Sequence, residues 1–164
     1  TESLDWKARV DFRTRRLHAE VTLTLKEASA GPLDLDTRDL DIRAVVDAQG
    51  KPLPFHLAPP EPILGSRLRI ELPKGLRQLT VRYRTSPQAS ALQWLTPSQT
   101  AGGQHPFLFS QCQAIHARSV VPLQDTPRIR IRYTAALTIP KALKAVMAAG
   151  GCSVNSPAPA PGRC

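Results

Sequence analysis

The sequence predicts one all-β domain, and three observations lead to this prediction. Apolar and polar residues alternate over most of the chain, which is the period of a half-buried strand. The alternating segments are short and recur about every 8 to 12 residues, with turn residues between them. Apolar residues make up 41% of the 164 residues, which is enough for a hydrophobic core. This pattern favours a sandwich or a strongly curved sheet.

The first two alternating segments predict an antiparallel hairpin. Residues 6–12 and 17–25 each carry apolar side chains at every second position, on either side of an arginine-rich polar turn. We expect one face of this hairpin to be buried. Two further short strands are predicted around residues 33–35 and 41–46, and Gly50 supplies the positive φ of the turn that ends the second.

The middle of the chain contains a proline-rich segment followed by two further alternating segments. Residues 52–62 are rich in proline, which has no amide donor, and predict a connection or an edge strand. Residues 67–72 and 79–84 alternate again and predict two strands. Residues 86–106 read as irregular, and residues 107–113 as strand-like.

The end of the chain divides into a strand, a short segment and a tail. The clearest alternation runs over residues 128–139 and predicts the last strand. One or two helical turns are expected at residues 141–149, too few to be stable alone. Residues 150–164 are small, proline-rich and low in complexity. The prediction is therefore a β domain at 1–149 and a disordered tail at 150–164.

The net charge of +9 raises the question of an anionic partner. The arginines are spread along the chain, many of them in the polar phase of alternating segments, and aromatic residues make up only 5%. A solvated sheet face explains this charge better than a nucleic-acid surface, so no nucleic-acid partner is expected. The sequence also predicts no membrane span and no signal peptide, and its three cysteines form no disulfide pattern, which favours a cytoplasmic protein.

No self-contained catalytic motif is present. None of the histidines is followed by glutamate, so H-E-x-x-H is absent, and C-x-x-C, G-x-S-x-G and a glycine-rich phosphate loop are absent too. Aspartates cluster between residues 34 and 41, but without the glycine and glutamate of an EF-hand loop, so they predict a solvated turn. We expect no cofactor and no metal within this chain. The histidines are His18, His56, His105 and His116.

Residues 91–127 are rich in uncharged polar side chains within an otherwise apolar or aromatic setting. Gln111 and Gln113 are two residues apart, so on a strand they would point to the same side. Two buried amides are costly unless they find hydrogen-bond partners. The residues by themselves leave two alternatives open, internal hydrogen bonding or an edge that faces a ligand.

Two segments carry a resemblance to a known family. Residues 91–102 (ALQWLTPSQTAG) and 105–116 (HPFLFSQCQAIH) resemble the leukotriene A(4) hydrolase branch of the gluzincin zinc aminopeptidases. Shorter matches at 35–40, 85–87 and 124–127 support it, and the resemblance extends over residues 4–149.

The resemblance implies a fold and separate functions for two domains. The region would be an aminopeptidase N-terminal domain, a saddle of curved antiparallel or mixed sheets that docks on a catalytic domain. Zinc is expected only in that catalytic domain, which is absent from this chain, so the chain alone should not turn over peptides. The implied activity of the whole enzyme is removal of N-terminal residues from peptides, and epoxide hydrolysis is left open. The resemblance ends after Ala149, and a truncated product, a shortened isoform or a gene-model artefact would each explain this.

The resemblance also implies site residues. Gln111, Cys112, Gln113 and Ala114 match a strand that reaches over the active-site cleft. Gln113 would accept hydrogen bonds from the free α-amine of a peptide, since an amide oxygen can receive an ammonium group without adding a second titrating carboxylate. Gln111 and the backbone at Ala114 would shape the first subsite.

A further set implied by the resemblance is structural. Arg118 and Asp125 would form a buried charge pair, and Pro122 and Pro127 would form turns that hold the strand in place. The alternative to the enzyme-domain hypothesis is a non-catalytic protein-interaction module, which would associate with itself or with a longer relative through its docking face.

Overall fold

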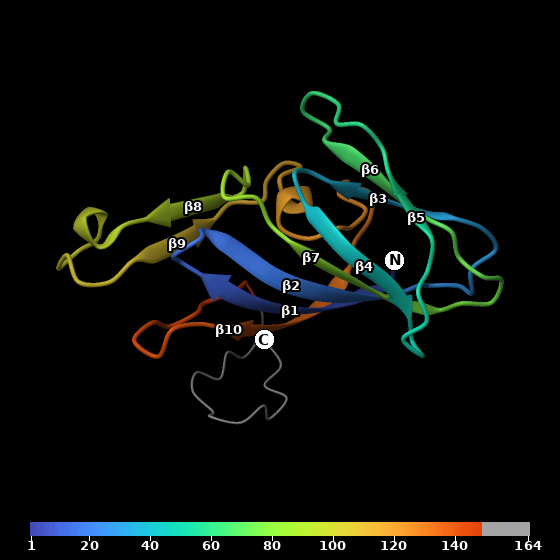
Figure 1. Cartoon of the computed structure of the whole chain (residues 1–164), viewed down its shortest axis with the longest axis horizontal. Helices are drawn as coiled ribbons and strands as arrows, with labels where there is room; N and C mark the ends of the chain where they lie inside the picture. Colours follow the sequence, from blue (N-terminus) through green and yellow to red (C-terminus); the bar gives the residue numbers. More distant parts are fainter. Residues whose placement is uncertain (149–164) are drawn as a thin grey trace.

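The alternating segments do form strands, and the all-β prediction is confirmed. The computed structural model describes residues 1–148, in which the only helical elements are two 3-10 turns, η1 (Pro97–Gln99) and η2 (Ala117–Ser119) (Figure 1). The predicted tail at 150–164 lies outside the described residues. The strands are β1 (Ser3–Asp11), β2 (Arg16–Thr24), β3 (Leu33–Thr37), β4 (Asp41–Asp47), β5 (Phe55–Leu57), β6 (Ser66–Ile70), β7 (Gln78–Arg84), β8 (Leu92–Leu95), β9 (Phe107–Ser110) and β10 (Arg132–Thr138).

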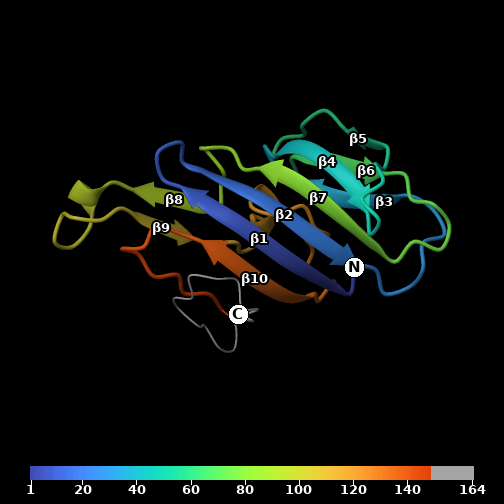
Figure 2. The ribbon, with the colours of Figure 1, turned by 60° about the horizontal axis from the view of Figure 1, so that its bottom comes forward.

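Five strands form the larger sheet, in the order β10-β1-β2-β7-β4 (Figure 2). β1 and β2 form the predicted antiparallel hairpin, with Trp6 opposite Val21. β10 pairs in parallel with β1, while β2–β7 and β7–β4 are antiparallel, so the sheet is mixed. Because side chains alternate across a strand, this sheet has one apolar face and one polar face.

The smaller sheet has the order β3-β6-β5 and packs on the apolar face of the larger one. β5 lies at its edge, as proline-flanked segments require. The core between the two sheets draws on both. Its fully buried members from the larger sheet are Val21, Leu23, Val45, Leu79 and Val81, and those from the smaller sheet are Leu35, Leu68 and Ile70.

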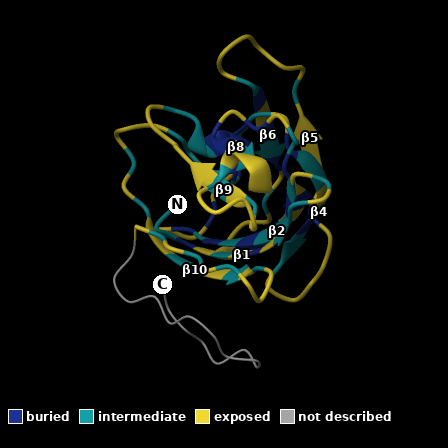
Figure 3. Ribbon diagram, turned by 90° about the vertical axis from the view of Figure 1, so that its left-hand side faces the viewer, coloured by how far each residue is buried: buried dark blue, intermediate teal, exposed yellow. Residues whose placement is uncertain are grey.

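β8 and β9 form a separate antiparallel hairpin that extends from the body of the domain (Figure 1), and its tip is largely exposed (Figure 3). Its base is anchored by a second apolar cluster that includes Leu17, Leu92 and Val120. Phe12 also packs edge-on against Trp94, with ring centroids 5.4 Å apart. The anchored base fixes the direction of the segment that follows β9.

Several boundaries differ from the sequence prediction. β8 lies inside residues 86–106, which read as irregular, because a four-residue strand between turns leaves too short an alternation to detect. β9 ends at Ser110 rather than at residue 113. β10 begins at Arg132, because the preceding residues 126–129 form a turn. The helical turns expected from residue 141 are wrong, since the described part, residues 141–148, holds a turn and no helix.

Gly65 closes the loop between β5 and β6 against β3, and this contact is specific to glycine. Its φ of +76° lies in the left-handed region, and a Cβ there would lie 2.2 Å from the carbonyl oxygen of Thr37. Gly50 has a similar φ of +82° but open space around it.

We therefore expect Gly65→Ala to lower the free energy of unfolding by roughly 2–5 kcal/mol, the cost of left-handed strain plus a backbone clash. Gly50→Ala is the matched control, with strain alone, and should cost about 1–2 kcal/mol. Urea denaturation monitored by circular dichroism measures both. Equal losses for the two variants would contradict the close approach at Gly65.

Candidate functional site

The four residues predicted to bind substrate lie in the turn that follows β9. Because β9 ends at Ser110, the prediction that Gln111 and Gln113 share a strand face is wrong. The turn is closed by backbone hydrogen bonds from the Gln111 N–H to the Ala91 carbonyl and from the His116 N–H to the Cys112 carbonyl, each 2.9 Å. Gln111, Cys112, Gln113 and Ala114 are all exposed.

The two glutamines of the turn have different environments. The Gln111 side-chain oxygen accepts a hydrogen bond from the Gln113 backbone N–H at 3.1 Å, so it stabilises the turn. The Gln113 carboxamide has no hydrogen-bond partner within residues 1–148. The peptide bond between Gln113 and Ala114 is cis. Of the two amides, Gln113 is therefore the one whose side-chain oxygen is free to accept from a ligand.

Cys112 does not have the environment of an activated nucleophile. Neighbouring atoms desolvate the thiol although the residue as a whole is exposed, and this raises its pKa, with a further increase from the Asp125 carboxylate. A raised pKa keeps the thiol protonated at neutral pH, and the thiolate is the reactive form.

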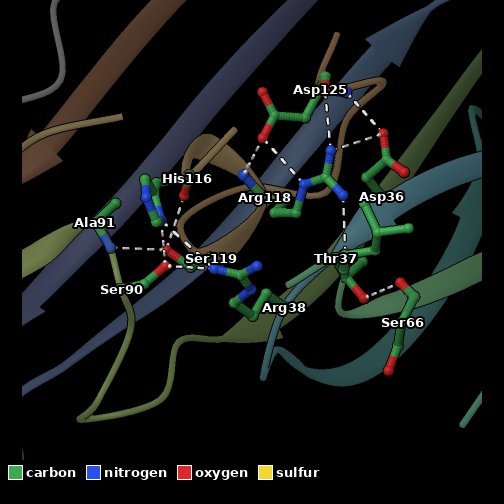
Figure 4. A network of polar contacts seen from close by, with 11 residues as sticks. Asp36, Thr37, Arg38, Ser66, Ser90, Ala91, His116, Arg118, Ser119 and Asp125 are labelled. Carbon is green, nitrogen blue, oxygen red and sulfur yellow. Dashed lines mark hydrogen bonds and ion pairs between the residues drawn. The ribbon is translucent and has the colours of Figure 1, made fainter. Parts of the chain in front are cut away.

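A buried arginine lies immediately after this turn. Arg118 is 4% exposed, and its Nε donates to the Asp125 carboxylate at 3.2 Å (Figure 4). Its two other nitrogens donate to the carbonyl oxygens of Leu64 at 2.8 Å and Asp125 at 2.9 Å. Asp36 of β3 lies 3.7 Å from the guanidinium and accepts the Asp125 backbone N–H at 2.9 Å. The buried charge is thus compensated by carboxylates and carbonyls from three segments.

A second polar group, missed by sequence reasoning, adjoins the same turn. The Nδ1 atom of His116 lies 2.9 Å from the Ser90 hydroxyl and 3.5 Å from Arg38. The Ser119 hydroxyl donates to the His116 carbonyl at 2.8 Å and accepts the Ala91 N–H at 3.0 Å (Figure 4). The sequence offers no signal for this group, because its members come from segments far apart in the chain and none belongs to a catalytic motif.

The prolines of the predicted structural set lie in different environments. Pro122 is fully buried, whereas Pro127 is exposed in the turn closed by the hydrogen bond from the Ile129 N–H to the Thr126 carbonyl. The turn lies between Asp125 and β10. The structural role assigned to Pro127 stays a prediction.

The described residues do not fit a resident metal ion. Within residues 1–148 no three His, Cys, Asp or Glu side chains lie close enough together to bind one. No helix in this part of the chain is long and apolar enough to cross a membrane.

An open cavity of about 480 Å³ lies beside the tip of the β8–β9 hairpin. It is lined in part by His105, Phe107 and Leu143, but by none of the predicted site residues.

The Arg118 contacts predict a large loss of stability on substitution. Arg118→Met should lower the free energy of unfolding by roughly 3–5 kcal/mol, because it removes the guanidinium that pairs with the Asp125 carboxylate and donates to the Leu64 carbonyl. Arg132→Met is the matched control, since Arg132 pairs with Glu2 while its side chain is 82% exposed, and should cost at most about 1 kcal/mol. Urea denaturation measures the difference. A loss at Arg118 no greater than at Arg132 would contradict the network's role.

Known proteins are similar to this chain in sequence. Leukotriene A-4 hydrolase of Xenopus laevis is 43% identical over 150 residues, which are 87% of this chain and 24% of that protein. Leucine aminopeptidase 2 of Yarrowia lipolytica is 45% identical over 129 residues, or 76% of this chain and 20% of that protein. The chain therefore spans about a quarter or less of these relatives.

Solved structures agree. Yeast LTA4 hydrolase in complex with bestatin superposes with a TM-score of 0.78 at 36% identity, covering 85% of this chain and 23% of that one. An M1 zinc metallopeptidase from Deinococcus radiodurans shares the fold at 18% identity, with a TM-score of 0.69 over 99% of this chain and 37% of its own. The family model described as the Peptidase M1 N-terminal domain matches residues 1–156. This chain belongs to the Peptidase M1 N-terminal domain family.

Proposed function

We propose that this chain is the substrate-gating N-terminal domain of a zinc aminopeptidase similar to leukotriene A-4 hydrolase, and that it is inactive without a catalytic domain. The exposed Gln113 carboxamide, which has no partner within the described residues, supports the proposal most directly. In this proposal Gln113 accepts a hydrogen bond from the free α-amine of a peptide.

The geometry around Gln113 suits a fixed acceptor. Its backbone N–H is held by the Gln111 side chain, and the turn is tied to Ala91 at one end and to the buried Arg118 at the other. Because the backbone of the turn is anchored, binding would cost mainly the rotamer entropy of the exposed Gln113 side chain. A carboxamide at a fixed backbone position favours discrimination between a free and a blocked amine. In this proposal the Gln111 side chain and the Cys112 carbonyl support the turn, and the backbone at Ala114 helps to shape the first subsite.

The proposed inactivity rests on the residues available for chemistry. The described residues hold no metal-binding group, and the raised pKa of the Cys112 thiol does not favour a nucleophile. The metal chemistry of the proposed enzyme would belong to the part of the relatives that this chain does not span. Peptide N-termini and a catalytic domain are therefore the proposed partners, and a cytoplasmic location stays a prediction.

A chimera tests the proposal. In it, this chain replaces the matching segment of the Xenopus relative. We expect the chimera to hydrolyse a fluorogenic amino-acid amide and the chain alone, with zinc added, to show no hydrolysis. Gln113→Leu in the chimera should raise KM by roughly tenfold, the effect of losing one hydrogen bond to a charged group.

Gln49→Leu is the matched control, because Gln49 is exposed in the turn after β4, away from the site. It should leave KM within about twofold of the unsubstituted chimera. The proposed inactivity would be refuted if the isolated chain hydrolysed the amide and a substitution within the chain abolished that hydrolysis. An active chimera whose KM is insensitive to Gln113 would refute the role of the amide.

A non-catalytic interaction module is the second candidate, and exposed aromatic residues favour it. Phe107 and Phe109 lie on one face of β9 and are 51% and 44% exposed. Large apolar side chains on the surface often mark a docking site. The same two residues would serve either self-association or contact with a catalytic domain.

Self-association predicts a dimer of the 164-residue chain that depends on β9. Phe107→Ser with Phe109→Ser should convert the dimer to a monomer in light scattering at high concentration, because the substitutions remove exposed apolar area. A clean monomer before any substitution would count against this candidate.

A further inference from the structure

A group of arginines surrounds His18 on the polar face of the larger sheet. Arg9 is opposite His18 on β1, and Arg84 is opposite it on β7. Arg16 lies two residues before His18 on β2, so its side chain points to the same face. Neighbouring strands are roughly 4.8 Å apart, which brings the long side chains of Arg9 and Arg84 within reach of one point above His18.

These arginines differ from the other cations of the same face. Arg9, Arg16 and Arg84 have no carboxylate within 4.0 Å in the described part of the chain. By contrast, Glu20 pairs with both Lys7 and Arg82 at 3.3 and 3.5 Å, in the adjacent row of the sheet. The guanidinium of Arg16 donates to the Thr85 carbonyl at 2.8 Å, which fixes its position without neutralising it.

Two acids lie near these arginines, and both are already engaged. Asp41 of β4 is opposite Arg84 of β7, and its carboxylate pairs with Arg43.

The second acid is Asp11. One oxygen of Asp11 accepts the backbone N–H groups of Arg13 and Thr14 at 3.0 and 3.2 Å. Its other oxygen lies 3.8 Å from the Nε2 atom of His18. Arg13 and Arg15 are exposed in the same β1–β2 turn and add positive charge beside the group. The sheet therefore ends in a concentration of arginines that its own carboxylates do not balance.

The pKa of His18 is lowered in this positively charged environment. Partial burial lowers the pKa of His18, and Arg9 and Arg84 lower it further, against a smaller opposite effect of Asp11. A neutral imidazole can still donate one hydrogen bond to an anion.

We propose that Arg9, Arg16 and Arg84, together with His18, bind a diphosphate group. The planar guanidinium fork suits phosphate oxygens, and three of them around one point require a ligand with high charge in a small volume. A diphosphate meets this requirement, whereas the carboxylates of a peptide are spread over separate flexible side chains. This site is independent of the proposed role of Gln113.

Inorganic pyrophosphate is the probe, titrated into the 164-residue chain by isothermal calorimetry at about 50 mM salt. The double variant Arg9→Gln, Arg84→Gln should bind at least roughly tenfold more weakly. Arg128→Gln with Arg130→Gln is the matched control: both are exposed, carry no ion pair in the described residues and lie before β10, toward the opposite end of β1. It removes the same charge and should weaken binding by less than about twofold.

Circular dichroism tests whether each variant is folded. If the spectrum of the double variant changes, the single substitutions at Arg9 and Arg84 replace it, and each should weaken pyrophosphate binding by roughly threefold. Raising the salt to about 200 mM should weaken binding to the unsubstituted chain more than to the double variant. Absence of pyrophosphate binding, or an equal loss in the control variant, would overturn the site. A triglutamate peptide that binds as tightly as pyrophosphate would overturn the assignment to phosphate.

Discussion

The charge of Arg118 is the constraint on which the rest of the candidate site depends. A buried guanidinium is tolerated only when its donors are satisfied, and here the partners come from the loop before β6, from β3 and from the segment before β10. These segments are therefore fixed relative to one another. The turn that carries Gln113 immediately precedes Arg118, so its backbone is held in place at that end. A loop would otherwise be among the least ordered parts of such a domain.

The two faces of the larger sheet differ in burial and in their contribution to stability. The inner face buries Val21, Leu23 and Val81 against the smaller sheet and supplies most of the hydrophobic stabilisation. Within the smaller sheet, the loop before β6 approaches β3 closely at Gly65, since a side chain there would collide with the backbone. The outer face is solvated, and its charges need not serve stability. That freedom allows one row of arginines to remain unpaired beside a row that is paired by Glu20.

The candidate site also has the form expected of half of a binding surface. An amide acceptor on an anchored turn can orient an ammonium group, but it cannot by itself polarise or cleave a peptide bond. The relatives named above are about four to five times as long as the segments they share with this chain. The proposed function, with recognition by this chain and chemistry in a catalytic domain, is consistent with the exposed Gln113 and with the lack of a metal-binding group in the described residues.

The sequence by itself determined the strand content, because period-two alternation is a local consequence of burying one face of a strand. It also determined the family, through residues 91–116, and so drew attention to Gln111–Ala114. Only the tertiary structure decided that β9 ends before Gln111, that β8 exists, and that β10 lies parallel to β1. It alone brought Asp36 and Leu64 to Arg118 and placed Arg9 and Arg84 beside His18. The physical reason is that strand pairing and the compensation of charge depend on residues distant in sequence, whereas alternation depends on near neighbours.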